Sequence, residues 1–155
     1  MHTWFECKIQ YEKTMENGMN KKVTEPYLVD ALSFTDAEAR FIEEMTPFIS
    51  GEFTVSDIKR ARYSELFFAE DAESDRWFKC KLTFITLDEK SGSEKKTSTN
   101  VLVQATDLRD AVKKLDEGMK GSMADYIIAS VAETAIMDVY PYTEGPHDKP
   151  EFPEA

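Results

Sequence analysis

The sequence predicts an α+β fold made by internal duplication of a strand–strand–helix–strand (β-β-α-β) unit, with antiparallel sheet and one helix in each copy. The main observation is a repeat at a nearly constant spacing. Trp4–Tyr11 recurs as Trp77–Phe84 at a shift of 73 residues, with four of eight positions identical. Lys21–Met45 recurs as Lys95–Met119 at a shift of 74 without a gap. Because a repeat of this length decides the architecture, each element can be predicted twice.

The first strand of each copy alternates between apolar and polar residues, which is typical of a strand with one buried face. The apolar positions are Phe5, Cys7, Ile9 and Tyr11 in the first copy and Phe78, Cys80, Leu82 and Phe84 in the second. Turn signals at 17–18 and 91–93 then predict hairpins. The second strands are expected near 23–32 and 97–105.

A helix is expected after each hairpin because apolar residues recur at helical spacing. The two stripes are Phe34, Ala37, Phe41, Ile42 and Met45, and Leu108, Ala111, Val112, Leu115 and Met119. Ser33 or Thr35 is the expected N-cap of the first helix, and Thr106 that of the second. Pro47 should end the first helix, and the glycines at 118 and 121 the second.

The third strand of each copy is expected to be long, covering 53–67 and 126–140, which match in apolar pattern only. Its alternation breaks once in each copy. The breaks lie between Val55 and Ile58 and between Ile128 and Val131. A β-bulge at each break would restore the register.

The two copies are predicted to pack as one domain over residues 1–142, about a pseudo-twofold axis. Each copy, at about 70 residues, is near the lower limit for independent stability. Their expected bounds are about 1–69 and 76–142, joined by an acidic, solvated linker at 70–75. The Pro-rich tail at 143–155 lacks apolar periodicity and is expected to be disordered.

Composition limits the classes of partner and the location. The formal net charge is −11 and the pI is about 4.7, which disfavours non-specific attraction to nucleic acid or anionic membrane. No apolar run approaches the length of a membrane span, so no membrane association is expected. The first residues enter a strand pattern directly, and the two cysteines fit a reducing compartment. The expected location is cytoplasmic.

No catalytic, cofactor or metal site is predicted. His2 and His147 lie near the two ends of the chain, away from elements that could hold them rigidly. Cys7 and Cys80 share the core parity, which favours burial as small apolar residues over a nucleophilic or redox role. The acidic stretch 70–75 lacks the glycine and distant glutamate of an EF-hand loop.

One arrangement favours binding, namely Trp4 with Lys8 and, in the second copy, Trp77 with Lys81. These residues have the parity opposite to the core, so they form the candidate binding surface on an open sheet face. Proteins that bind single-stranded nucleic acid use aromatic rings to stack on bases and lysines to meet phosphates. The alternative is that both tryptophans pack between the copies or under a loop. That alternative is favoured, because large aromatic side chains are on average highly buried.

Three segments carry a resemblance to a known family: Trp4–Lys8, Thr54–Arg60 and Tyr63–Phe67. With them, the chain resembles a bacterial and phage family described only as a domain of unknown function. The resemblance covers nearly all of the chain apart from the Pro-rich tail. It implies no activity, substrate or cofactor. Occurrence in phages favours a role connected with nucleic acid or with a host.

The favoured interpretation is a non-enzymatic binding protein with duplicated surfaces, in a bacterial or phage setting. Its partner is open: another protein, a single-stranded nucleic acid, or a second copy that pairs through an exposed strand edge to give a homodimer. The alternative is a small enzyme with its site between the two repeats. The absence of matched histidine, cysteine or paired-acid sites argues against an enzyme.

Overall fold

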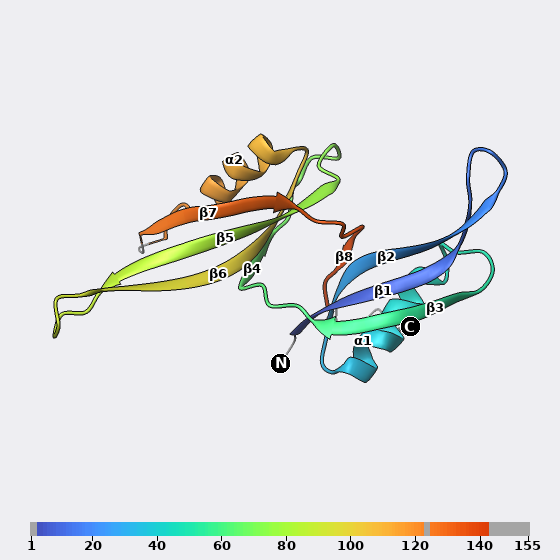
Figure 1. The fold of residues 1–155 in the computed structure, drawn as a ribbon, viewed down its shortest axis with the longest axis horizontal. Helices are drawn as coiled ribbons and strands as arrows, with labels where there is room; N and C mark the ends of the chain where they lie inside the picture. Colours follow the sequence, from blue (N-terminus) through green and yellow to red (C-terminus); the bar gives the residue numbers. More distant parts are fainter. Residues whose placement is uncertain (1–2, 123–124, 143–155) are drawn as a thin grey trace, which may run out of the picture. The chain divides into compact units, whose positions relative to one another are not determined.

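A computed structural model describes residues 3–122 and 125–142, and over these residues the fold is α+β with two helices and two mostly antiparallel sheets (Figure 1). The predictions for His2, His147 and the Pro-rich tail lie outside the described residues. The chain divides into two compact units. Unit 1 is Met1–Ala61 with Asp138–Ala155, and unit 2 is Arg62–Met137.

Unit 1 contains a four-stranded sheet in the order β3-β1-β2-β8, with helix α1. Its elements are β1 (Thr3–Thr14), β2 (Asn20–Ala31), α1 (Phe34–Met45), β3 (Phe53–Arg60) and β8 (Val139–Tyr140). The β1–β2 hairpin turns at Gly18, whose φ of 83° falls in the region that glycine adopts without strain. Only β8 runs parallel to its neighbour, β2.

Unit 2 contains a sheet in the order β4-β6-β5-β7, with helix α2. Its elements are β4 (Glu65–Phe67), β5 (Arg76–Leu87), β6 (Glu94–Ala105), α2 (Leu108–Gly118) and β7 (Tyr126–Glu133). The hairpin turn has Gly92 at a φ of 72°. In each unit the third strand, the first, the second and a short parallel strand therefore follow one another across the sheet.

The two predicted bulges are confirmed. The register of β1 against β3 shifts between Lys8, opposite Asp57, and Ile9, opposite Val55. The register of β5 against β7 shifts between Lys81 and Leu82. One extra residue in the third strand therefore keeps its apolar side chains on the buried face.

The prediction of one long third strand in each copy was wrong. β3 ends at Arg60 and β7 at Glu133, because β1 and β5 begin there and offer no further backbone partner. The last bonds of these ladders run from Ala61 N to Trp4 O and from Thr134 N to Trp77 O, at 2.9 Å each. The chain then continues into the sheet of the other unit.

That continuation exchanges short strands between the units. β4 follows β3 of unit 1 in the sequence but pairs with β6 of unit 2, and β8 follows β7 of unit 2 but pairs with β2 of unit 1. A side chain fixes the chain just beyond each short strand. Gln104 Oε1 accepts from the Ala69 N–H at 3.0 Å, and Asp30 Oδ2 accepts from the Tyr142 N–H at 3.4 Å.

The helices begin at side-chain caps, one of which differs from the prediction. Ser33 caps α1 by accepting from the Asp36 N–H at 3.1 Å, as expected. Asp107, not Thr106, caps α2, with Oδ1 accepting from the Asp110 N–H at 2.8 Å. Thr106 instead donates its N–H to Asp110 Oδ2, so the side chains of Asp107 and Asp110 each accept from a backbone N–H at the start of the helix.

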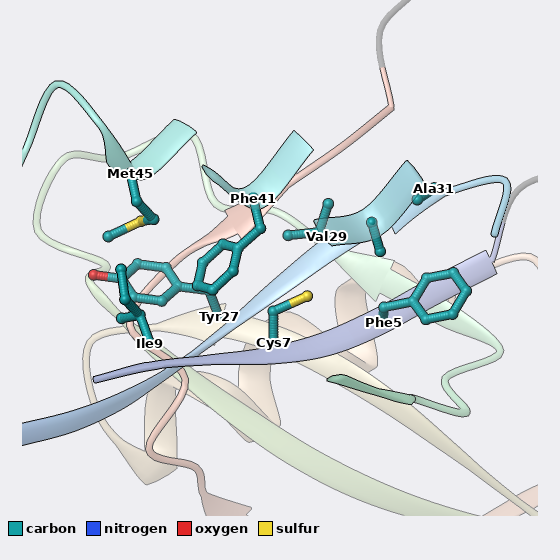
Figure 2. Close-up of a cluster of buried hydrophobic side chains, with 9 residues drawn as sticks. Phe5, Cys7, Ile9, Tyr27, Val29, Ala31, Phe41 and Met45 are labelled. Atoms are coloured by element: carbon teal, nitrogen blue, oxygen red, sulfur yellow. The ribbon is translucent and has the colours of Figure 1, made fainter. Parts of the chain in front are cut away.

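Each helix covers one face of its own sheet. In unit 1, side chains from β1, β2 and α1 meet in one apolar cluster (Figure 2). Phe5, Cys7 and Ile9 are fully buried there, and Phe41 contacts Tyr27 with ring centroids 5.5 Å apart. The equivalent cluster of unit 2 is Phe78, Cys80, Leu82, Val101, Val103, Ala105, Ala111 and Leu115. Over residues 3–122 and 125–142, the opposite face of each sheet has no helix on it from the same unit.

The helical stripes are only partly buried. Phe34, Ile42 and Leu108 belong to the predicted stripes but are 47%, 40% and 50% exposed, respectively. Arg40 is 9% exposed instead, with its Nε bonded to Asp36 Oδ2 at 3.1 Å. Within the described residues, neither helix is both long and apolar enough to cross a membrane.

Candidate functional site

The face of the unit 2 sheet that α2 does not cover is the first candidate surface. Phe78, Cys80 and Leu82 pack against α2, so the alternating side chains of β5 lie on the other face. Those side chains are Trp77, Lys79, Lys81, Thr83, Ile85 and Leu87. We refer to this side of β5, β6 and β7 as the lysine face.

Trp77 does not offer its ring to a ligand. The side chain is 2% exposed, and Phe68 contacts it edge to face with ring centroids 5.4 Å apart. Phe68 follows β4 directly and is itself 50% exposed. A ring with so little exposed surface does not offer a face for stacking on a base. The burial of Trp77 agrees with the favoured alternative, in which the tryptophans are packed, whereas Trp4 is only part-buried.

Lys79 and Lys81 are exposed and lie next to each other on the lysine face, with Cα atoms about 7 Å apart along β5, whereas Leu102 on the same face is fully buried. On β6, Lys79 lies opposite Leu102 and Lys81 opposite Asn100, so the nearest neighbours bring no negative charge. Lys96 lies further along, opposite Ile85.

The neighbours of these lysines on β7 are also neutral, Ala132 opposite Lys79 and Ser130 opposite Lys81. Among the β6 residues opposite the lysine-face positions of β5, the carboxylate is Glu94, opposite Leu87 near the hairpin turn.

The corresponding face of unit 1 is electrostatically different. Lys8 lies opposite Asp57, and the Glu6 carboxylate forms an ion pair with the Lys59 ammonium, with Oε2 and Nζ 3.9 Å apart. Direct cross-strand neighbours have Cβ atoms about 5 Å apart, so the Lys8 charge is offset locally. Lys8 is also only part-exposed, as is Trp4.

Strand register allows the two faces to be compared position by position. Glu6, Glu12, Asp30 and Asp57 of unit 1 correspond to Lys79, Ile85, Gln104 and Ser130 of unit 2. All four carboxylates are thus missing from the matched positions, whereas lysines occupy both Lys8 and Lys81. The lysine face is cationic at its centre even though the whole chain is acidic.

A groove of about 500 Å³ lies beside Phe68, between the segment after β4 and the end of α2. Phe68 and Gln104 both line it. Since Gln104 Oε1 accepts from the Ala69 N–H, the side-chain amide points its Nε2 donors elsewhere. The neighbouring Gly118 allows close approach of the Phe67 ring, because a Cβ there would lie 2.8 Å from two ring carbons.

A polar cluster at the same end of unit 2 has a structural role. The Lys114 ammonium bonds Asp71 Oδ2 and Asp110 Oδ2 at 2.9 Å each and also the Ser74 hydroxyl, so its three donors are in use. Hydrogen bonds from Ser74 and then from Lys114 lower the pKa of Asp71 to about 2. Ser74 is 4% exposed, so the predicted acidic linker 70–75 is not uniformly solvated.

The two cysteines are free thiols and fully buried, as predicted. Burial is the main cause that raises the pKa of Cys7 to about 12, and it raises the pKa of Cys80 to about 11. A nucleophilic cysteine needs a thiolate near neutral pH, so neither thiol is activated. Residues 3–122 and 125–142 contain no group of three or more metal-ligating side chains placed to hold an ion.

Of the four residues predicted for the binding surface, Lys81 alone is both exposed and without an opposing charge across the strands. Lys79 was missed because the equivalent position of the first copy is Glu6, which hides the pattern unless the copies are compared for charge. Phe68 was missed because its contact with Trp77 joins the segment after β4 to a different part of the chain, strand β5. No sequence signal marks that contact.

Residues 3–142 match the model of a protein family described as Domain of unknown function (DUF4494). No curated protein matches the chain.

Proposed function

The chain belongs to the DUF4494 family, a domain of unknown function, and we propose that this protein is a non-enzymatic binding protein that holds nucleic acid on the lysine face of unit 2. The observation that carries this proposal is the local charge. The Lys79 and Lys81 side chains are exposed on the lysine face, and the four matched carboxylates of unit 1 are missing from it. Paired lysines on a sheet are suited to meet successive backbone phosphates.

The acidic net charge of the chain does not prevent such binding. The Debye length at physiological ionic strength is about 8 Å, so carboxylates elsewhere on the surface are largely screened at the lysine face. The charges that matter are those within a few ångströms of the phosphates. The side chains opposite Lys79 and Lys81 on the neighbouring strands include Leu102, Asn100 and Ser130, and these are neutral.

Binding through phosphates also explains why no activated side chain is needed. Burial raises the pKa values of both thiols, so neither is a thiolate near neutral pH. The Lys114 ammonium has its three donors in hydrogen bonds. The alternative function, a small enzyme with a site between the repeats, stays a prediction.

Internal duplication is part of the same proposal. The repeat at shifts of 73 and 74, the equivalent strand orders and the matched bulges support a duplicated β-β-α-β ancestor. The two copies differ in the charges on their helix-free faces, since four carboxylates of unit 1 have no counterpart at the matched positions of unit 2. The pseudo-twofold arrangement of the copies stays a prediction.

The test measures binding of a fluorescently labelled oligothymidylate of about 16 nucleotides by anisotropy, at about 50 and about 200 mM salt. The double variant Lys79→Gln/Lys81→Gln should bind more weakly. Each lysine that neutralises a phosphate contributes about 0.7 to the slope of log K against log salt concentration, so the slope should fall by about 1.4.

Two matched controls remove the same charge elsewhere. Lys8→Gln changes the equivalent residue of unit 1, and Lys95→Gln changes the neighbour of Lys96 that has the opposite strand parity. Both variants should retain the affinity and the salt slope of the wild-type protein. If the wild type does not bind the oligonucleotide at about 50 mM salt, or if all three variants lose affinity equally, the lysine face is not the binding site.

A further inference from the structure

Phe68 is half-exposed and contacts Trp77 at one end of the lysine face. We propose that Phe68 is a stacking platform for an unpaired base and that the site therefore selects single-stranded over double-stranded nucleic acid. This inference rests on the proposed function, since it deepens the same site.

The ring of Phe68 is held firmly enough to act as a platform. Its neighbour Phe67 ends strand β4, which pairs with β6, and the next residue, Ala69, donates its N–H to Gln104. The chain is therefore fixed on both sides of Phe68. The Phe68 ring packs against Trp77, which is itself only 2% exposed.

The contact with Trp77 also orients the ring. The two ring planes make an angle of 85°, so the edge of one ring meets the face of the other. Such edge-to-face pairs are a favoured aromatic geometry. Because only part of the Phe68 surface is used in this way, half of the side chain remains open to a ligand.

The groove beside Phe68 is suited to a base and not to a phosphate. Glu70 and Glu117 line it together with Asp71, whose charge is offset by Lys114. The remaining carboxylates would repel a phosphate but not a neutral base. Gln104 lines the same groove, and its Nε2 donors can reach a carbonyl oxygen on a base edge.

The order of the side chains along β5 gives the path of the bound nucleic-acid strand. Trp77, Lys79 and Lys81 follow at alternate positions on one face, with a rise of about 3.3 Å per residue. A base on Phe68 at the Trp77 end thus leaves the adjoining phosphates over the two lysines. A duplex cannot present an unstacked base to Phe68, which is the physical reason for single-strand selectivity.

The experiment compares the labelled oligothymidylate with a mixed-sequence duplex of the same length, using the full chain. Phe68→Ala should weaken binding of the single strand by roughly 5- to 150-fold, the effect of losing one stacked base, and should leave duplex binding unchanged. Phe68→Tyr should restore single-strand binding, whereas Phe68→Leu, which keeps apolar bulk over Trp77, should not.

Phe48→Ala is the matched control, because Phe48 is a phenylalanine of unit 1 that is 73% exposed. It should bind both nucleic acids as the wild type does. Thermal unfolding of each variant checks that Trp77 remains packed.

Three results would overturn the inference. Equal loss of single-strand and duplex binding in Phe68→Ala would show a general effect on the surface, and full binding by Phe68→Leu would show that packing suffices. Unchanged single-strand binding by Phe68→Ala, together with the loss expected of the lysine variants, would reject the stacking platform and leave the proposed function standing.

Discussion

Replacing Trp77 by alanine tests whether the ring is part of the structure or part of a ligand surface. The ring is 2% exposed and contacts Phe68, so its removal leaves a cavity beneath the segment after β4. An aromatic side chain buries about 150–250 Å². At about 25 cal/mol per Å² this corresponds to about 4–6 kcal/mol, which is an upper value because denatured chains already bury some surface. We expect Trp77→Ala to lower the free energy of unfolding by about 3–5 kcal/mol.

The assay is urea denaturation followed by far-ultraviolet circular dichroism, which does not depend on the tryptophan that is removed. Trp4→Ala is the matched variant. Trp4 occupies the position of unit 1 that is equivalent to Trp77, but it is only part-buried. It should cost less, because part of its ring already lies in water in the native state. A loss below about 1 kcal/mol for Trp77→Ala, or a larger loss for Trp4→Ala than for Trp77→Ala, would refute the assignment of Trp77 to the core.

Three further predictions concern stability and reactivity. Cys7 and Cys80 should react with a thiol reagent at neutral pH only as fast as the native protein opens, because burial raises their pKa values to about 12 and about 11, and rapid labelling would contradict this. Gly118→Ala should lower the free energy of unfolding by about 1–3 kcal/mol through a clash with Phe67, although alanine is normally the better helix former, and a stabilised variant in urea denaturation would show that the ring can move. The native-state pKa of Asp71, about 2, lies below the ordinary 3.8, so its contribution to stability is fully present above pH 3.8 and is lost as the pH falls towards 2. Asp71→Asn should therefore be less stable than the wild type at neutral pH. Melting temperatures of the two proteins that differ equally at pH 7 and pH 2 would contradict this.

The proposed site could be predicted only in part. Strand parity placed Lys81 on the open face correctly, because side chains of a strand alternate with a fixed period of two residues. The same parity placed Trp77 there, but parity does not say whether another segment covers the face. Phe68 contacts Trp77 from the segment that follows β4, and such a contact depends on how β4 pairs. The charge difference between the faces was present in the sequence at Glu6 and Lys79 and needed the strand register to be recognised.

The amino-acid sequence by itself determined the hairpins, the two helices and the bulges, since turns, caps and periodicity act between residues that are close in the chain. The misassigned N-cap at Thr106 was an error of one position within such a local signal. Only the tertiary structure decided where the chain goes after Arg60 and Glu133. Strand β4 pairs in unit 2 and strand β8 in unit 1, because β1 and β5 begin there and the free edges of β6 and β2 supply the next backbone partners. Two or three residues carry too little pattern to specify a distant edge, so that choice depends on the whole ladder of hydrogen bonds.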